Sequence, residues 1–155
     1  MNNIFKGLVF GSCTFGLTAF SPSTPQAKGS RDEALALVKI ALIYQDEHGL
    51  AAALLEANKA DCQFSLKDLH VMAVNSDGTV LAHRDSAKVG KNLLKCRDAR
   101  GIFINKEFIR LGGSEDGKGW VRYHMPDPFT KVPQHWCAYV ERLNDVYWVC
   151  GYHLL

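Results

Sequence analysis

The six histidines are the side chains best suited to metal binding, yet their spacing contains no metal-ligand motif. None of the patterns H-x-H, H-x-x-x-H or H-E-x-x-H occurs in the sequence. Three histidines could still converge from neighbouring strands, but no carboxylate ligand accompanies them. We therefore expect neither a metal nor another cofactor, and the alternative is a site formed by His70, His83 and His124.

A nucleophilic or acid–base active site also lacks a sequence signature. No G-x-S-x-G elbow is present. The acidic residues Glu115, Asp116 and Asp127 stand in turn-forming segments, where acids occur for local reasons. The sequence therefore favours a non-catalytic protein. An exported hydrolase or lyase, built on a cysteine–histidine or serine–histidine pair that only the fold assembles, is the alternative.

Two alternating segments carry side chains that suit ligand binding. Strand alternation in residues 119–125 separates two groups, Trp120, Arg122 and His124 on one face and Val121, Tyr123 and Met125 on the other. Residues 69–74 likewise separate His70 and Met72 from their neighbours. Aromatic walls, one guanidinium and imidazole donors together suit a small carboxylate. The alternative is that these polar side chains line a solvated face of the sheet.

A long N-terminal helix is expected to support these strands. Ser30 and Glu33 form a capping-box pattern, and the acids Asp32 and Glu33 suit the positive end of a helix. Apolar residues then recur at helical spacing up to Tyr44, and Gly49 is a natural stop. A second helix is predicted over residues 50–60.

Five strands and one short helix are predicted after the helical segment. Residues 69–74 turn through Asp77 and Gly78 into residues 79–83, which is a strong hairpin signal. A short helix over residues 102–111 precedes strands at about residues 119–125, 135–143 and 146–153. The predicted fold is α+β and PAS-like, with a five-stranded antiparallel sheet that carries a cavity on one face.

Residues 1–27 have the layout of a secretory signal peptide. Lys6 precedes an apolar run over residues 7–20, and small residues follow up to Ala27. This run is short for a membrane span, which needs about 20 apolar residues. We therefore expect residues 28–155 to form a single periplasmic or secreted domain. A retained anchor or a lipid attachment is the alternative.

Composition limits the classes of partner. The formal net charge is +2 with both signs interspersed, and no basic run occurs, so nothing favours nucleic-acid binding. At 155 residues with 47% hydrophobic residues, the chain can bury one core.

The cysteine content agrees with export. Four cysteines follow the leader, Cys62, Cys96, Cys137 and Cys150. An even number in an exported chain suggests disulfides. If the last hairpin turns at residues 144–145, Cys150 opposes Tyr139, and Cys137 is a diagonal neighbour at about 7 Å, which needs local twist for a bond. We predict the pairs Cys137–Cys150 and Cys62–Cys96, with four free buried thiols as the alternative.

Several short motifs follow one another between residues 68 and 152. After the alternating strand at 69–74 come Asp77-Gly78 with Leu81-Ala82-His83, Gly90-Lys91-Asn92, Asp98 with Gly101, Gly119-Trp120-Val121 with Tyr123, Pro126 with Pro128, Tyr139, and Trp148-Val149. Their order resembles the single Cache family, the extracytoplasmic PAS-like domains that sense small molecules in bacterial receptors. The resemblance covers residues 31–153.

The resemblance implies roles for individual residues. Three aromatic residues match pocket positions of the family, Trp120, Tyr123 and Tyr139. The full predicted ligand set adds His70, Met72, Arg122, His124 and Trp136. Three polar residues match positions that brace the loop over the pocket, His83, Asn92 and Asp98, the last as a cap of the short helix.

Two departures from the family pattern bear on the ligand. His70 replaces a pocket tyrosine, and Trp136 stands where the family has a lysine. Arg122 or His135 could supply the missing positive charge, or the ligand is more aromatic or less anionic.

Cache domains of receptors lie between two membrane spans, and no second span follows the last predicted strand here. We therefore expect a freestanding module that binds a small, anionic organic ligand. A membrane receptor or histidine kinase is its expected partner, and a homodimer through the N-terminal helix is a further expectation. The alternative is an interaction protein whose sheet docks a membrane partner.

Overall fold

The computed structural model describes residues 27–127 and 131–154, so all but the last residue of the predicted signal peptide lies outside the described residues. Helix α1 (Arg31–His48) begins with the predicted capping box: Ser30 Oγ accepts the Glu33 N–H at 3.3 Å, and Glu33 Oε2 accepts the Ser30 N–H at 2.8 Å. It ends at Gly49, whose φ is 84°. Helix α2 (Leu50–Ala57) then begins at once and is shorter than predicted.

The sheet is antiparallel throughout the described residues and has the predicted five strands plus a short sixth. Its order is β1-β2-β6-β5-β4, and β3 also pairs with β2. The strands are β1 (Ser65–Leu66), β2 (Leu69–Asn75), β3 (Val80–Ala82), β4 (Lys118–Pro126), β5 (Pro133–Leu143) and β6 (Val146–His153). Strand β1 was not predicted, because a strand of two residues is too short to show an alternation of apolar and polar residues.

Two hairpin turns set the register of the sheet. In the turn between β2 and β3, Gly78 has a φ of 85°, and Asn75 and Asp77 accept the Thr79 N–H at 2.8 and 2.9 Å through their side chains. In the turn between β5 and β6, Asn144 has a φ of 55°. These conformations explain the residue types, because glycine and asparagine tolerate positive φ best.

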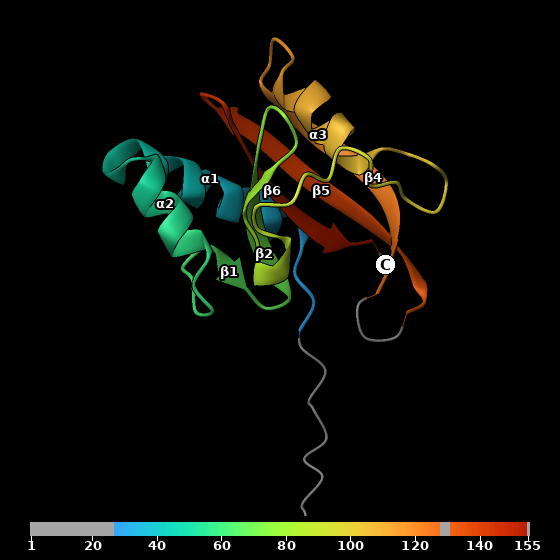
Figure 1. Cartoon of the computed structure of the whole chain (residues 1–155). Coiled ribbons are helices and arrows are strands. Elements are labelled where there is room, and N and C mark those ends of the chain that lie inside the picture. Colours follow the sequence, from blue (N-terminus) through green and yellow to red (C-terminus); the bar gives the residue numbers. More distant parts are fainter. Residues whose placement is uncertain (1–26, 128–130, 155) are drawn as a thin grey trace, which may run out of the picture.

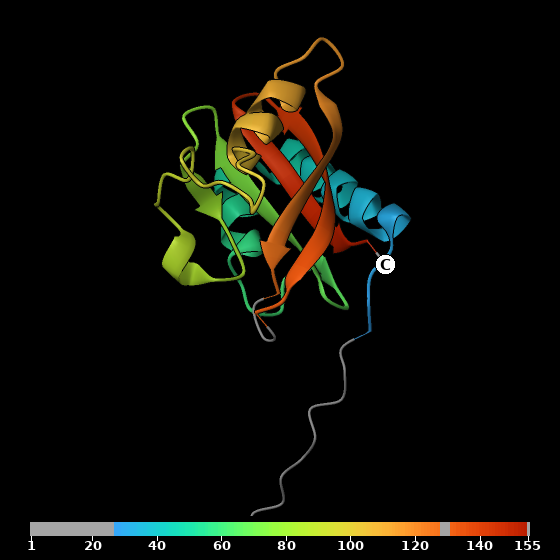
Figure 2. The ribbon, with the colours of Figure 1, turned by 90° about the vertical axis from the view of Figure 1, so that its right-hand side faces the viewer.

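The sheet lies between helix α1 on one face and the helix of residues 104–112 on the other (Figures 1 and 2), and it separates two hydrophobic cores. On one face, α1 packs its apolar residues against side chains that include Val71, Tyr139 and Trp148. On the other face, helix α3 (Ile104–Gly112) packs Ile104 and Phe108 against residues of β4, β5 and β6. The segment between β3 and α3 contains one turn of 3-10 helix, η1 (Ser86–Lys88).

The predicted disulfides are absent from the described residues, where all four cysteines are free. The register is as predicted, since Cys150 opposes Tyr139 and Cys137 opposes Tyr152. The correction has a geometric reason: a diagonal pair in a regular ladder starts too far apart for an S–S bond. Three of the four, Cys62, Cys137 and Cys150, are buried and act as small apolar groups.

Among the described residues, no helix combines the length and the apolar character that crossing a bilayer requires.

Candidate functional site

The sheet divides the eight predicted ligand residues into two groups of four. Strand alternation and register direct one group toward the α1 side, Trp120, Arg122, His124 and Tyr139. They direct the other group toward the α3 side, His70, Met72, Tyr123 and Trp136. The structure therefore does not assemble them into one pocket.

On the α1 side, the aromatic residues pack against helix α1. The Trp120 and Tyr139 rings lie 5.0 Å apart between centroids, and the Arg31 guanidinium sits 4.6 Å from the Trp120 centroid. The Tyr139 hydroxyl donates to Glu141 at 2.6 Å, and Glu141 also pairs with Lys39 of α1 at 2.6 Å. Burial, followed by the bond to Glu141, raises the pKa of Tyr139.

Arg122 and His124 lie on this same side, apart from Tyr123 and Trp136. Arg122 is exposed and opposes Cys137 in the register. The His124 ring lies 4.0 Å from that of His135, also between centroids. A bidentate clamp by Arg122 on a ligand that touches Tyr123 therefore has no support in this geometry.

On the α3 side, Tyr123 and Trp136 form a stacked pair with ring centroids 6.4 Å apart and an interplanar angle of 3°. Phe108 of α3 meets Tyr123 edge-on at 6.2 Å. A Cβ atom at Gly151 would lie 2.8 Å from the Tyr123 hydroxyl oxygen and 3.7 Å from the Trp136 ring. A side chain at position 151 would therefore displace the Tyr123 hydroxyl group, and glycine leaves room for it. Burial raises the pKa of Tyr123, with smaller contributions from Cys150 and Cys137.

Two buried ring nitrogens have no hydrogen-bond partner in the described part of the chain: Trp136 Nε1 on this face, and His70 Nε2, whose ring contacts Cys62. The Trp136 ring lies against that of His153, with centroids 3.6 Å apart. An indole N–H can only donate. A buried donor without an acceptor lowers the stability of the protein by about 1–3 kcal/mol. An oxygen atom of a ligand placed next to this N–H would remove that penalty.

Two imidazoles at the β2–β3 edge are held neutral. Burial lowers the pKa of His70, and the charge of Arg84 lowers it further. Burial, together with Lys88 and His70, lowers the pKa of His83 to about 4. The His83 Nδ1 atom accepts the Asp85 N–H at 2.8 Å, which requires an unprotonated nitrogen.

A cysteine–histidine contact occurs beside this edge, where Cys62 Sγ lies 3.7 Å from His70 Nδ1. The thiol side chain is only 4% exposed, so a substrate has no direct access to it. Among residues 27–127 and 131–154, no group of three histidine, cysteine or acidic side chains could hold a metal ion.

All three predicted bracing residues make hydrogen bonds. The Asn92 amide donates to the Asp77 carbonyl at 2.7 Å and accepts the Leu94 N–H at 3.1 Å. Asp98 does not cap the short helix, which is a correction: the residue before α3 is Phe103, without a side-chain cap bond. Instead, the buried Asp98 carboxylate joins its own loop to strand β4.

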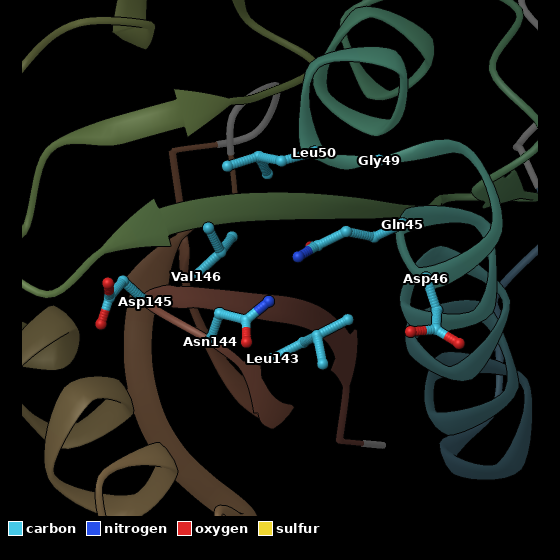
Figure 3. Close-up of a pocket in the computed structure, with 8 residues that line it drawn as sticks. All are labelled: Gln45, Asp46, Gly49, Leu50, Leu143, Asn144, Asp145 and Val146. Carbon is cyan, nitrogen blue, oxygen red and sulfur yellow. The ribbon is translucent and has the colours of Figure 1, made fainter.

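Two concavities of the described residues lie away from the α3 side. One of about 330 Å³ is found where α1 and α2 meet the hairpin of β5 and β6 (Figure 3), and one of about 360 Å³ lies between α1 and the end of β5. On the α3 side, Tyr123 fills the space over Gly151. The sequence analysis did not include Gly151 and His153 in the site. Alternation along β6 places both on the face opposite to Cys150, and this could have identified them as residues of the α3 side.

Comparisons with known proteins agree with this architecture. The family profile described as a Cache domain matches residues 59–154. The comparison with curated proteins finds no match.

Three solved structures share the fold. A periplasmic sensor domain of a chemotaxis protein is 22% identical, with 79% of this chain and 88% of that chain covered at a TM-score of 0.57. A Cache chemosensory domain described for carboxylic acid recognition is 16% identical, with 80% and 88% covered at 0.60. A methyl-accepting chemotaxis protein from Vibrio parahaemolyticus is 18% identical, with 79% and 86% covered at 0.63. On its profile match and its fold, this chain belongs to the Cache domain family.

Proposed function

We propose that the chain is a non-catalytic, extracytoplasmic module that binds a small carboxylate on the α3 side of its sheet. The observation that carries the proposal is the buried Trp136 Nε1 atom, which has no hydrogen-bond partner among the described residues; His70 Nε2 is a second such atom. A carboxylate oxygen is the acceptor that an indole N–H lacks. The carboxylic acid recognition described for one related Cache domain supports the same ligand class.

Ligand entry requires movement of the segment between β3 and α3. The two nitrogens are closed off from solvent, and Leu93 of this segment packs into the core on the α3 side. Residues 84–92 are all exposed, and they are attached to the β2–β3 hairpin by the backbone hydrogen bonds of Gly90 and Lys91 with Val80 and by the Asn92 side chain.

The test is a thermal-shift and calorimetric screen of the protein against short-chain carboxylates, amino acids, amines and purines. A ligand at 100 times its dissociation constant adds about 2.7 kcal/mol, which moves the melting temperature by several degrees. We expect a dose-dependent shift from carboxylates. No shift from any class, with a cooperative melt, would refute the proposal.

A matched pair of variants locates the site. Trp136→Phe keeps the stack on Tyr123 and deletes the N–H, so it should weaken carboxylate binding about tenfold. Trp120→Phe makes the same change on the α1 side and should leave the affinity unchanged. If the two variants behave alike, the site is not on the α3 side.

The affinity should rise as the pH falls from 8 to 6. Burial lowers the pKa of His70 in the free protein, so its imidazole is neutral there. A bound carboxylate favours the charged imidazole and raises that pKa, so binding takes up a proton. A pH-independent affinity, measured by calorimetry, would remove His70 from the site.

Docking of a membrane receptor, a histidine kinase or a second copy through α1 is the second candidate. Ile40 and Ile43 are 42% and 57% exposed and share one face of α1, which supports an apolar contact there. Sedimentation of the wild type and of Ile43→Lys tests the dimer: a monomeric wild type at all concentrations would exclude it.

Export depends on residues 1–27, nearly all of which lie outside the described residues. Mass spectrometry of the protein from the periplasm or medium tests cleavage after Ala27.

A further inference from the structure

One cavity lies outside the proposed carboxylate site. It has a volume of about 330 Å³ and is bounded by the last turn of α1, the start of α2 and the turn between β5 and β6 (Figure 3). Its walls include the apolar side chains of Leu50, Leu143 and Val146. Gly49 stands at its edge, and a Cβ atom there would meet no atom within 4 Å, so this side is open.

The side-chain amide of Gln45 borders this cavity. It lies on the buried stripe of α1 that includes Leu37, Val38 and Ala41, and is itself only 5% exposed. Its Oε1 atom accepts the Trp148 indole N–H at 2.6 Å. Because an indole N–H is only a donor, this contact determines which end of the amide faces the tryptophan.

The other end of the Gln45 amide points into the cavity. Figure 3 shows the nitrogen directed toward the space between Leu50, Leu143 and Val146. No hydrogen bond from this nitrogen to another described residue is present. Gln45 Nε2 does not belong to the buried atoms without a partner, so it is open to the cavity and can donate to an acceptor oxygen from outside the protein.

The charges around the cavity decide which acceptor fits. Asp46 and Asp145 belong to its lining, both are exposed, and neither forms an ion pair within the described residues. Figure 3 shows Asp145 turned away from the centre, which leaves Asp46 beside Gln45. A carboxylate ligand would meet repulsion here, whereas a neutral carbonyl next to an ammonium group would satisfy both Gln45 and Asp46.

We infer that this cavity is a second ligand site, which takes a small primary amine bearing a carbonyl oxygen and an apolar side chain, in the manner of an amino-acid amide. The carbonyl accepts from Gln45 Nε2, the ammonium pairs with Asp46, and the apolar group lies against Leu50 and Val146.

The experiment is an NMR titration of the ¹⁵N-labelled protein with L-leucinamide up to about 10 mM, the range of a weak small-molecule site. Saturable shifts of the Gln45 side-chain amide are expected. N-acetyl-leucinamide lacks the ammonium and isoamylamine lacks the carbonyl, so each should bind about fivefold more weakly. Absence of a saturable shift, or equal binding of all three compounds, would overturn the inference.

Two variants test the assigned contacts. Asp46→Asn, on the surface, should weaken leucinamide about threefold and leave N-acetyl-leucinamide unchanged. Gln45→Glu keeps an oxygen toward Trp148 but replaces the amide N–H₂ donor with a second oxygen. The ligand carbonyl then has no donor, so isoamylamine, which lacks the carbonyl, should bind this variant more tightly than leucinamide does. Trp136→Phe, on the other face, should leave the leucinamide affinity unchanged, although it weakens carboxylate binding at the first site. Leucinamide binding that ignores Asp46→Asn, or that Trp136→Phe abolishes, would overturn the assignment, even if Gln45→Glu fails to fold.

Discussion

Asp98 anchors the segment that covers the α3 side, and its removal should be among the most destabilising single changes in this protein. Its carboxylate is fully buried. Oδ1 accepts the N–H groups of Arg100 and Ile102, each at 2.8 Å, and Oδ2 accepts the N–H of His124 at 3.0 Å. Asp98→Ala leaves these three donors without an acceptor. Each costs about 1–3 kcal/mol, and water reaches some of them, so we expect a loss of about 3–5 kcal/mol.

Asp98→Asn is the matched variant that separates the two oxygens. Its remaining oxygen can accept from Arg100 and Ile102, but its NH₂ group then faces the His124 N–H. One charge-assisted bond is lost, which costs about 1.5–3 kcal/mol. The expected order of stability is therefore wild type, Asn, Ala. Arg100→Ala is the control, because its guanidinium is 52% exposed and 3.6 Å from the carboxylate, and should change little.

Urea unfolding followed by tryptophan fluorescence measures these differences, with an unchanged slope required for each variant. Equal stabilities of the Asn and Ala variants would show that hydrogen bonds of the carboxylate to both the loop and strand β4 do not stabilise the protein. An Ala variant within about 0.5 kcal/mol of wild type would refute the whole argument.

The pH dependence supplies an independent check. Burial alone would raise the pKa of Asp98, but the N–H groups of Ile102, His124 and Arg100 outweigh it and hold that pKa below its usual value. A lowered pKa means that the stabilisation is complete above the unfolded pKa of about 4 and is lost as the pH falls through the folded value. The difference between wild type and Asp98→Asn should therefore shrink in acid.

Three further predictions follow from local geometry. Burial lowers the pKa of His83 from 6.5 to about 4. The unfolded state therefore takes up a proton first, and stability should fall by about 2 kcal/mol between pH 6.5 and 4. His83→Asn keeps an acceptor for Asp85 and should lose this dependence in pH-resolved melts. Gly151→Ala should cost about 1–3 kcal/mol, and Tyr123→Phe in the same chain should recover part of it. Ser30→Ala should cost about 1 kcal/mol in urea unfolding.

The local elements of the fold were predictable because their signals are local. The capping box starts α1 at Arg31, and the Asp77-Gly78 turn joins β2 to β3. Alternation alone separates Trp120 from Tyr123, and the last turn sets Tyr139 opposite Cys150. These features depend on residues a few positions apart, whose backbone preferences do not need the rest of the chain.

The covered side of the sheet was not predictable in the same way. Alternation assigns Arg122 and Tyr123 to opposite faces, but only packing decides that α1 covers the face of Trp120. The bond between Gln45 and Trp148 spans 103 positions, and that between Asp98 and the His124 N–H spans 26.

The sequence by itself determined the order of the elements, the register of the last hairpin and the resemblance to Cache domains. Only the tertiary structure decided which aromatic residues support a helix, which buried nitrogens lack a partner, and that the cysteines stay apart. The physical reason is that burial and partner choice depend on contacts between distant segments, whereas caps, turns and alternation depend on the backbone nearby.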